Sequence, residues 1–178
     1  MIRKLPTREI FKRNQSRTVP DGFSHTRLWL HNIRSMHNVG SAFRSADAFG
    51  IGGLILSGYT PVPPRPELTK TALGAEKTVA WNHFDTSEQV LKYLAVENVS
   101  LVGLEQTGKS ISVTDLTLPV NRKICLLMGN EVTGIDNSLL TYCQQIVEIP
   151  QYGQKHSFNV SVAVGIALFA LHEIFRTE

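Results

Sequence analysis

Three polar segments of the chain combine glycines with basic and amide side chains that could contact a ligand. They are Asn32 to Gly50 (NIRSMHNVGSAFRSADAFG), Leu126 to Ile135 (LLMGNEVTGI) and Ile149 to Phe169 (IPQYGQKHSFNVSVAVGIALF). Gly129 lets backbone groups approach a ligand closely, because it carries no side chain. The guanidinium of Arg44 can hold a phosphate through two hydrogen bonds. Taken singly, such residues more often form turns, caps or surface ion pairs, so the combination carries the argument.

A fourth segment, GLEQTGKS from Gly103 to Ser110, fits the phosphate-loop pattern G-x-x-x-x-G-K-[ST]. A phosphate loop needs a helix directly after its lysine, because the amides at that helix end hold the phosphates. The residues that follow, ISVTDLTLPVN, are rich in β-branched side chains and contain Pro119, so they predict no helix. Nucleotide hydrolysis is therefore kept only as an alternative activity.

Short apolar strands alternate with helical stretches from about residue 26 onward, which is typical of an α/β domain with a mainly parallel sheet flanked by helices. The predicted strands are residues 26–32, 53–58, 78–84, 99–105, 123–129 and 145–150, each apolar enough to be buried on both faces. Ligands bind beyond the carboxyl ends of strands in such sheets. The three polar segments are therefore expected to converge on one pocket.

Capping residues predict where the helices begin and end. Asn38 is predicted to cap a helix that ends at Gly50. Arg44 lies one step off the apolar face of that helix, so its side chain is expected to reach the rim of the same pocket. Other predicted features are a capping box at Thr86 and Gln89 for a helix over 87–97, helix starts at Asp136 and Asn159, and a proline-rich loop over 59–67.

The composition predicts a single globular domain. With 178 residues, 42% of them hydrophobic, the chain can bury a core without a disulfide or structural metal. Cys125 and Cys143 lie in apolar runs without zinc spacing, so both are predicted to be reduced thiols of a cytoplasmic protein. The N-terminus lacks the apolar region of a secretory signal, and the longest apolar run, 160–171, is too short for a bilayer. That run is predicted to form a buried helix, with no membrane association.

Charge is concentrated near the N-terminus. Residues 1–20 carry six basic side chains and one acidic side chain, a net charge of +5, whereas the other 158 residues hold 12 basic and 14 acidic side chains. A basic arm on a near-neutral body is a common footprint for a phosphate backbone, although a solvated terminus has the same composition.

In this order, the three polar segments closely resemble motifs 1, 2 and 3 of the SpoU family of RNA 2′-O-ribose methyltransferases, of the SPOUT class. The resemblance runs from about Leu28 to Phe175, which divides the chain into a basic arm, 1–25, and a methyltransferase domain, 26–178. Gln151 stands where the family usually has methionine, and Phe158 where it usually has leucine. These departures affect the details of the expected adenine pocket and the choice of RNA.

The resemblance implies methyl transfer from S-adenosyl-L-methionine to a ribose 2′-hydroxyl in structured tRNA or rRNA, by a homodimer that needs no metal. It also implies that the C-terminal segment threads a loop to form a deep trefoil knot, in which GLEQTGKS is the first knot loop. The implied cofactor-binding residues are Leu104, Gly129, Ile149, Gln151 and Phe158. The implied catalytic residues are Arg44, Asn38, Glu131, Ser157 and Asn159.

Because a guanidinium stays protonated in proteins, Arg44 is expected to bind a phosphate and stabilise the developing alkoxide. Glu131 is expected to pair with a basic side chain or with backbone amides, and so to shape the pocket without acting as the base. A relative that binds RNA or the cofactor without catalysis is a further alternative to the methyltransferase.

Overall fold

The computed structural model describes residues 2–177, so Met1 and Glu178, the outer ends of the expected arm and domain, lie outside the described residues. Seven strands form one sheet in the order β3-β2-β1-β6-β4-β7-β5, and the paired strands run parallel. They are β1 (Arg27–His31), β2 (Gly53–Ser57), β3 (Trp81–Phe84), β4 (Ser100–Leu104), β5 (Ile111–Ser112), β6 (Ile124–Met128) and β7 (Gln145–Glu148). The prediction of an α/β fold with a mainly parallel sheet is confirmed.

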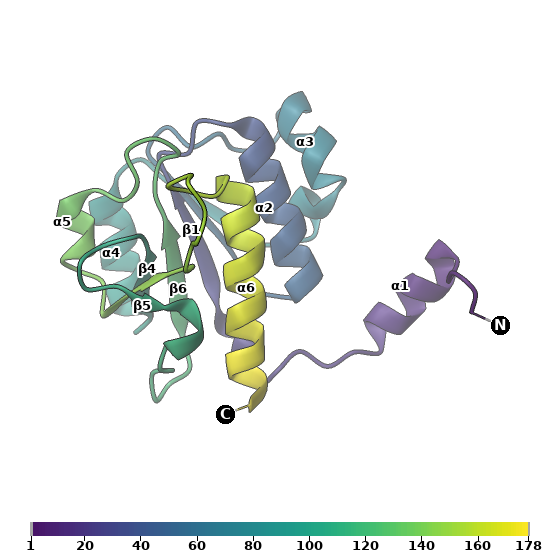
Figure 1. The fold of residues 1–178 in the computed structure, drawn as a ribbon. Coiled ribbons are helices and arrows are strands. Elements are labelled where there is room, and N and C mark those ends of the chain that lie inside the picture. Colours follow the sequence, from purple (N-terminus) through teal and green to yellow (C-terminus); the bar gives the residue numbers. More distant parts are fainter. Residues whose placement is uncertain (1, 178) are drawn as a thin grey trace.

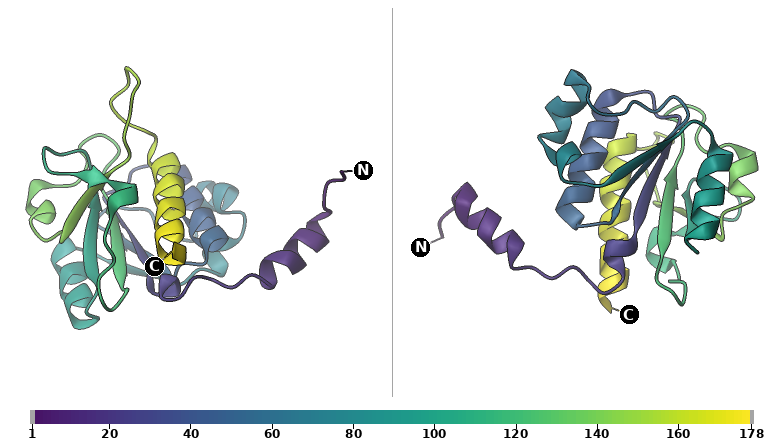
Figure 2. Two further views of the ribbon diagram at one scale, coloured as in Figure 1. Left: turned by 60° about the horizontal axis from the view of Figure 1, so that its bottom comes forward. Right: turned by 180° about the vertical axis from the view of Figure 1, so that it is seen from behind.

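Helices cover both faces of this sheet (Figure 1, Figure 2). One face carries α2 (Met36–Phe49) and α6 (Val160–Thr177), with α3 (Pro66–Ala72) beside α2, and the other carries α4 (Ser87–Val96) and α5 (Asn137–Leu140). Three short 3₁₀ helices are η1 (Phe23–His25), η2 (Ala75–Lys77) and η3 (Val113–Asp115). The N-terminal helix α1 (Thr7–Gln15) stands away from this body.

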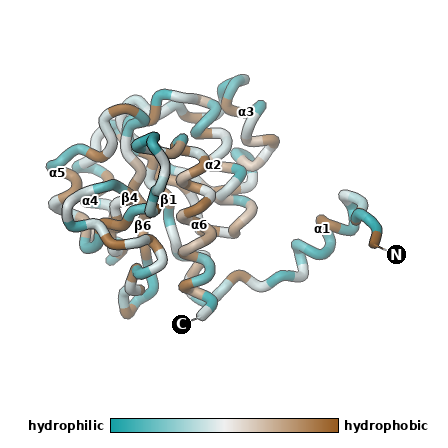
Figure 3. The backbone as a smooth tube through the Cα atoms, viewed as in Figure 1, coloured by the Kyte–Doolittle hydropathy of each residue, from teal (hydrophilic) through white to brown (hydrophobic). Residues whose placement is uncertain are grey.

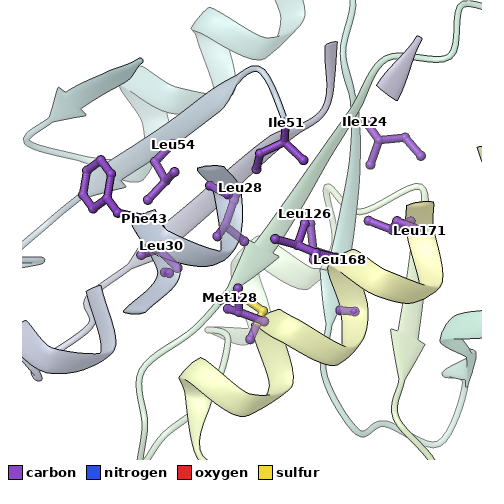
Figure 4. Packing of buried hydrophobic residues seen from close by; sticks show 14 of the residues in the cluster. Leu28, Leu30, Phe43, Ile51, Leu54, Ile124, Leu126, Met128, Leu168 and Leu171 are labelled. Carbon is purple, nitrogen blue, oxygen red and sulfur yellow. The ribbon is translucent and has the colours of Figure 1, made fainter. Parts of the chain in front are cut away.

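The core divides between the two faces because side chains alternate along each strand. Leu28 and Leu30 of β1 belong to the cluster under α2 and α6, whereas Trp29 belongs to the cluster under α4. Figure 4 shows Leu126 of β6 beside Leu168 of α6 in the larger cluster. Hydrophobic residues concentrate in the sheet and α6, while α1 is largely hydrophilic (Figure 3). Both faces of the central strands are therefore buried, as predicted.

Most predicted helix ends are confirmed, but the start of α2 is not. Ser35 caps α2, and its side chain accepts a hydrogen bond from the Asn38 amide. The prediction that Asn38 is the cap was wrong, because Ser35 occupies that position three residues earlier. Gly50 ends α2 in the left-handed region with φ of 70°, as expected. The capping box at Thr86, the start of α5 after Asp136 and the cap at Asn159 are also observed.

The edges of the sheet differ from the prediction. Strand β3 begins at Trp81 instead of residue 78, and its central Asn82 and His83 are exposed. It is an edge strand that pairs with β2 alone, so the expectation that it is buried on both faces was wrong. The two-residue strand β5 was not predicted. The loop expected over 59–67 ends two residues early, because α3 begins at Pro66.

Helix α6 is buried along one face. Its buried residues are Val164, Ala167, Leu168, Leu171 and Phe175. Val162 and Phe169 on the same helix are about half exposed, at 48% and 57%. By length and composition α6 could also cross a membrane, but the core helix of a soluble protein passes the same test. The prediction of a buried helix is thus confirmed for one face of α6 only.

Both cysteines are free thiols, as predicted. Cys125 is fully buried in β6, and burial raises the pKa of its thiol well above the ordinary value. Burial raises the pKa of the half-buried Cys143 to about 11. Both side chains therefore stay protonated at neutral pH and behave as small apolar groups.

Candidate functional site

A pocket lies where β4, β6 and β7 end, and it draws its walls from three distant parts of the chain. All five residues expected to bind the cofactor line this pocket, as do Glu131 and Ser157 from the expected catalytic set. The five are Leu104, Gly129, Ile149, Gln151 and Phe158. The predicted convergence of the second and third polar segments on one pocket is confirmed.

The wall from β6 is a tight turn between Gly129 and Gly134. The amide of Asn130 donates to the carbonyl of Gly134 at 3.0 Å, and the amide of Gly134 donates back at 2.9 Å. A Cβ at Gly129 would collide with the carbonyl of Gly134, so only glycine fits there. Gly134 itself has a positive φ of 70°. The two glycines thus shape the turn.

Glu131 projects from this turn to the start of α2. Its carboxylate accepts hydrogen bonds from the backbone amides of Arg34 and Ser35, at 2.9 and 3.0 Å, and from the Asn38 side-chain amide at 3.0 Å. Burial alone would raise the pKa of Glu131, but these hydrogen bonds outweigh it, and the pKa lies below the ordinary value. Glu131 is therefore held as a carboxylate by backbone amides, which agrees with the structural role expected for it.

Asn38 connects this contact to the third polar segment. Its side-chain oxygen accepts a hydrogen bond from the Asn159 side chain at 3.2 Å. The side-chain oxygen of Asn159 in turn accepts from the Ser161 amide at 2.9 Å and so caps α6. Glu131, Asn38 and Asn159 therefore form one hydrogen-bonded chain that ties the first, second and third polar segments together beside the pocket.

Three expected catalytic residues, Arg44, Asn38 and Asn159, do not line this pocket; Asn38 and Asn159 are tied to its wall through Glu131, whereas Arg44 lies apart from it. Arg44 is exposed on α2 and lines a separate hollow between α2 and α3. Arg44 lies six residues beyond Asn38, and a helix rises about 1.5 Å per residue, so its backbone is roughly 9 Å further along α2. The expectation that Arg44 reaches the rim of the same pocket within one chain was wrong.

Several pocket residues were missed by the sequence prediction. Glu105 follows β4, and its carboxylate accepts a hydrogen bond from the amide of Ile135 at 2.9 Å. Because Ile135 directly follows Gly134, this bond holds the end of the turn between Gly129 and Gly134. The side-chain amide of Gln106 donates to the carbonyl of His156 at 2.7 Å. Glu105 is the last residue of the strand predicted over 99–105 and Gln106 follows it, so their place at the carboxyl end of a predicted strand is the sequence signal that could have found them.

The segment GLEQTGKS does not form a phosphate loop. After Ser110 the chain continues as β5 and then η3, so no helix starts behind Lys109. The amides of this segment therefore lack the helix end that would hold a phosphate. The pocket it contributes to is lined by the apolar side chains of Leu104, Met128 and Ile149 together with polar backbone and side-chain groups. Such a lining fits a nucleoside, with apolar walls for a base and polar groups for a sugar.

The fold and the site define an α/β protein whose nucleoside-sized pocket is built on loops at the carboxyl edge of a parallel sheet. A family model described as the SpoU rRNA Methylase family matches residues 25–169. The chain belongs to this SpoU family.

Comparison with curated proteins finds relatives of the same kind. The 23S rRNA (guanosine-2'-O-)-methyltransferase RlmB of Escherichia coli strain K12 is 30% identical over 142 residues, which are 80% of this chain and 57% of that protein. The protein of the same name from Coxiella burnetii is 31% identical over 143 residues, with 80% and 56% covered. The chain thus spans little more than half the length of these relatives.

Solved structures with a similar fold include two with the cofactor bound. An AdoMet-bound rRNA methyltransferase from Sinorhizobium meliloti superimposes with a TM-score of 0.78 at 28% identity, covering 84% of this chain and 56% of that one. The SpoU methyltransferase AviRb from Streptomyces viridochromogenes, in complex with AdoMet, gives 0.77 at 25% identity, covering 88% and 60%.

Replacing Glu131 with glutamine is expected to destabilise the fold in a pH-dependent way. The folded pKa of Glu131 is depressed, so the carboxylate stabilises the fold above the ordinary pKa of 4.5, and this is lost as pH falls through the folded value. We expect Glu131→Gln to lower the free energy of unfolding by about 1 kcal/mol at neutral pH, and by less near pH 3. Urea denaturation at both pH values measures this.

Glu97→Gln is the matched control, because Glu97 is exposed at the end of α4 and its carboxylate takes part in no hydrogen bond or ion pair among residues 2–177. An equal loss of stability for Glu131→Gln at both pH values would contradict the assigned role of the carboxylate.

Proposed function

We propose that this protein transfers a methyl group from S-adenosyl-L-methionine to a ribose 2′-hydroxyl in structured RNA, either tRNA or rRNA. The carrying observation is that Leu104, Gly129, Ile149, Gln151 and Phe158 line one pocket at the ends of three parallel strands. Membership of the SpoU family and the printed activity of the RlmB relatives support the same reaction. We further propose that the protein acts in the cytoplasm, where such RNA is found.

When bound, S-adenosyl-L-methionine supplies an electrophilic methyl group. The protein must then hold the ribose oxygen in line with that carbon and dispose of its proton. Arg44 keeps its positive charge, so it binds the adjacent phosphate and stabilises the developing alkoxide, and that phosphate or water takes the proton. Asn38, Glu131 and Asn159 hold the loops in register, and Ser157 lies in the pocket wall.

A trefoil knot is also part of the proposal. Strand β7 lies between β4 and β5, although β4 and β5 are consecutive along the chain. The connection over residues 105–110 must therefore cross the end of β7, and the segment after β7 has to leave past it. The hydrogen bond from Gln106 to His156 joins these two segments. This arrangement supports threading of the C-terminal segment through the earlier loop.

We propose that the active form is a homodimer in which Arg44 of one chain serves the pocket of the other. Arg44 lies outside the pocket of its own chain, although its chemistry is what the reaction needs. Val162 and Phe169 form a half-exposed apolar face on α6, and Phe169 lies next to Phe49 of α2, with ring centroids 6.5 Å apart. Burying this face against a second copy would stabilise the dimer and bring α2 to the interface.

Residues 1–25 are proposed to be an RNA-binding arm, with residues 26–178 as the methyltransferase domain. Helix α1 buries none of its residues, and the chain joins the body at Phe23, which is fully buried against Phe175. The exposed basic side chains of the arm, such as Arg8 and Lys12, are free to follow a phosphate backbone.

Calorimetric titration with S-adenosylhomocysteine, beside ATP with Mg²⁺, tests the cofactor. We expect binding of S-adenosylhomocysteine alone, because the pocket fits a nucleoside and the phosphate-loop pattern lacks its helix. Methyl transfer to tRNA or rRNA isolated from a strain that lacks the gene should follow. Binding without transfer to any RNA would favour a non-catalytic relative, and binding of ATP alone would revive the hydrolase.

Mixing two inactive variants tests whether Arg44 acts across a dimer. Arg44→Ala removes the guanidinium, and Ile149→Arg places a charge in the cofactor pocket. If each pocket uses the partner's arginine, heterodimers hold one intact site, and an equimolar exchanged mixture should recover about a quarter of wild-type turnover. Recovery of no turnover by well-folded variants, or a monomer by light scattering at micromolar concentration, would contradict the shared site.

Deleting residues 2–20 tests the arm. We expect weaker RNA binding and a shallower dependence of log affinity on log salt, by about 0.7 to 0.9 for each phosphate that the arm would otherwise neutralise. Affinity for S-adenosylhomocysteine should stay unchanged, because no residue of the arm lines the pocket. An unchanged salt slope would show that the arm does not bind RNA.

A further inference from the structure

The hollow that holds Arg44 contains a second cation. Arg44 comes from α2 and Lys70 from α3, and both line the same depression between the two helices. The hydroxyl groups of Ser41, Ser45 and Thr71 also line it. Two cations and three hydroxyls are a suitable set of donors for one phosphate group.

Close packing of α3 on α2 fixes Lys70 beside Arg44. The two helices meet at Gly40, where an added Cβ would collide with the Thr71 hydroxyl and the Leu68 carbonyl. The Thr71 hydroxyl also donates a hydrogen bond to the carbonyl of His37 at 3.1 Å. Because Lys70 adjoins Thr71 and Arg44 lies one turn after Gly40, the backbones that carry both cations are held rigidly relative to each other.

Neither cation is neutralised within the chain. Among residues 2–177, Arg44 and Lys70 take part in no ion pair, and their side chains donate no hydrogen bond to another residue. Two like charges that share one hollow repel each other, and an anion placed between them would relieve that repulsion. The two positive charges in the hollow therefore favour the binding of an anionic group there.

We propose that Lys70 is the second cation of an RNA phosphate site, in which the planar guanidinium of Arg44 binds the two non-bridging oxygens of a phosphodiester and the Lys70 ammonium binds one of the same oxygens from α3. The inference rests on the proposed function, because it takes the anion to be the RNA backbone. Lys70 is then a binding and positioning residue that holds the phosphate next to the reacting ribose. The site pairs α2 and α3 as one RNA-contacting unit, which neither helix could provide alone.

Lys70→Met tests the proposal, because methionine keeps the length of the side chain and removes its charge. Lys70→Arg restores the charge, and Lys92→Met on α4 removes an equal charge from the opposite face of the sheet. RNA affinity is measured from low to high salt for all three, with S-adenosylhomocysteine affinity measured by calorimetry.

We expect Lys70→Met to weaken RNA binding about fivefold at 0.1 M salt and to reduce the salt slope by nearly one relative to Lys92→Met. Lys70→Arg should bind nearly as the wild type, and all variants should keep wild-type affinity for S-adenosylhomocysteine.

If Lys70→Met and Lys92→Met bind RNA alike while the wild type methylates RNA, the inference about Lys70 is overturned and the proposed function stands. If the wild type binds no S-adenosylhomocysteine, the proposed function fails. A lower salt slope for Lys70→Met alone would then still identify an RNA phosphate site.

Discussion

The carboxylate of Glu131 joins two parts of the chain that are 97 residues apart in sequence. It accepts hydrogen bonds from the backbone amides of Arg34 and Ser35, just before α2, and from the side-chain amide of Asn38 in the first turn of α2. Amides at a helix start are the groups that lack partners within the helix, and a negative charge there is favoured by the helix dipole. One carboxylate therefore fixes both the turn after β6 and the position at which α2 begins.

The pocket depends on this contact through Asn38 and Asn159. Asn159 is the cap of α6, so the hydrogen-bonded chain from Glu131 also sets where the last helix starts. Between β7 and α6 lies the loop that carries Gln151, Ser157 and Phe158, most of which is exposed. The two ends of this loop are held by the sheet and by the Asn159 cap, while residues 152–158 between them are exposed.

The pocket and the hollow that carries Arg44 are two separate surfaces of the protein. One lies at the carboxyl edge of the sheet and is built from turns, in which the carboxylates of Glu105 and Glu131 accept hydrogen bonds from backbone amides. The other lies between α2 and α3, carries Arg44 and Lys70, and leaves both charges available. The proposed transfer of a methyl group from a bound nucleoside cofactor to an RNA ribose needs both kinds of surface, and the proposed homodimer would bring them together.

The sequence by itself determined six of the seven strands, the capping box at Thr86 and the end of α2 at Gly50, and its resemblance to the SpoU family implied the five residues that line the pocket. The strands, the capping box and the helix end depend on local backbone chemistry, which can be read from neighbouring residues, whereas the pocket residues came from the family resemblance. Only the tertiary structure decided that the Asn38 side chain donates a hydrogen bond to the distant Glu131, although the Ser35 cap of α2 is itself a local bond to the Asn38 amide. It also decided that β3 is an exposed edge strand and that Arg44 lies apart from the pocket, because both follow from how packed helices and strands are placed in space. The spacing of residues along a chain gives no information about which strand lies at the edge of the sheet or how far Arg44 lies from the pocket.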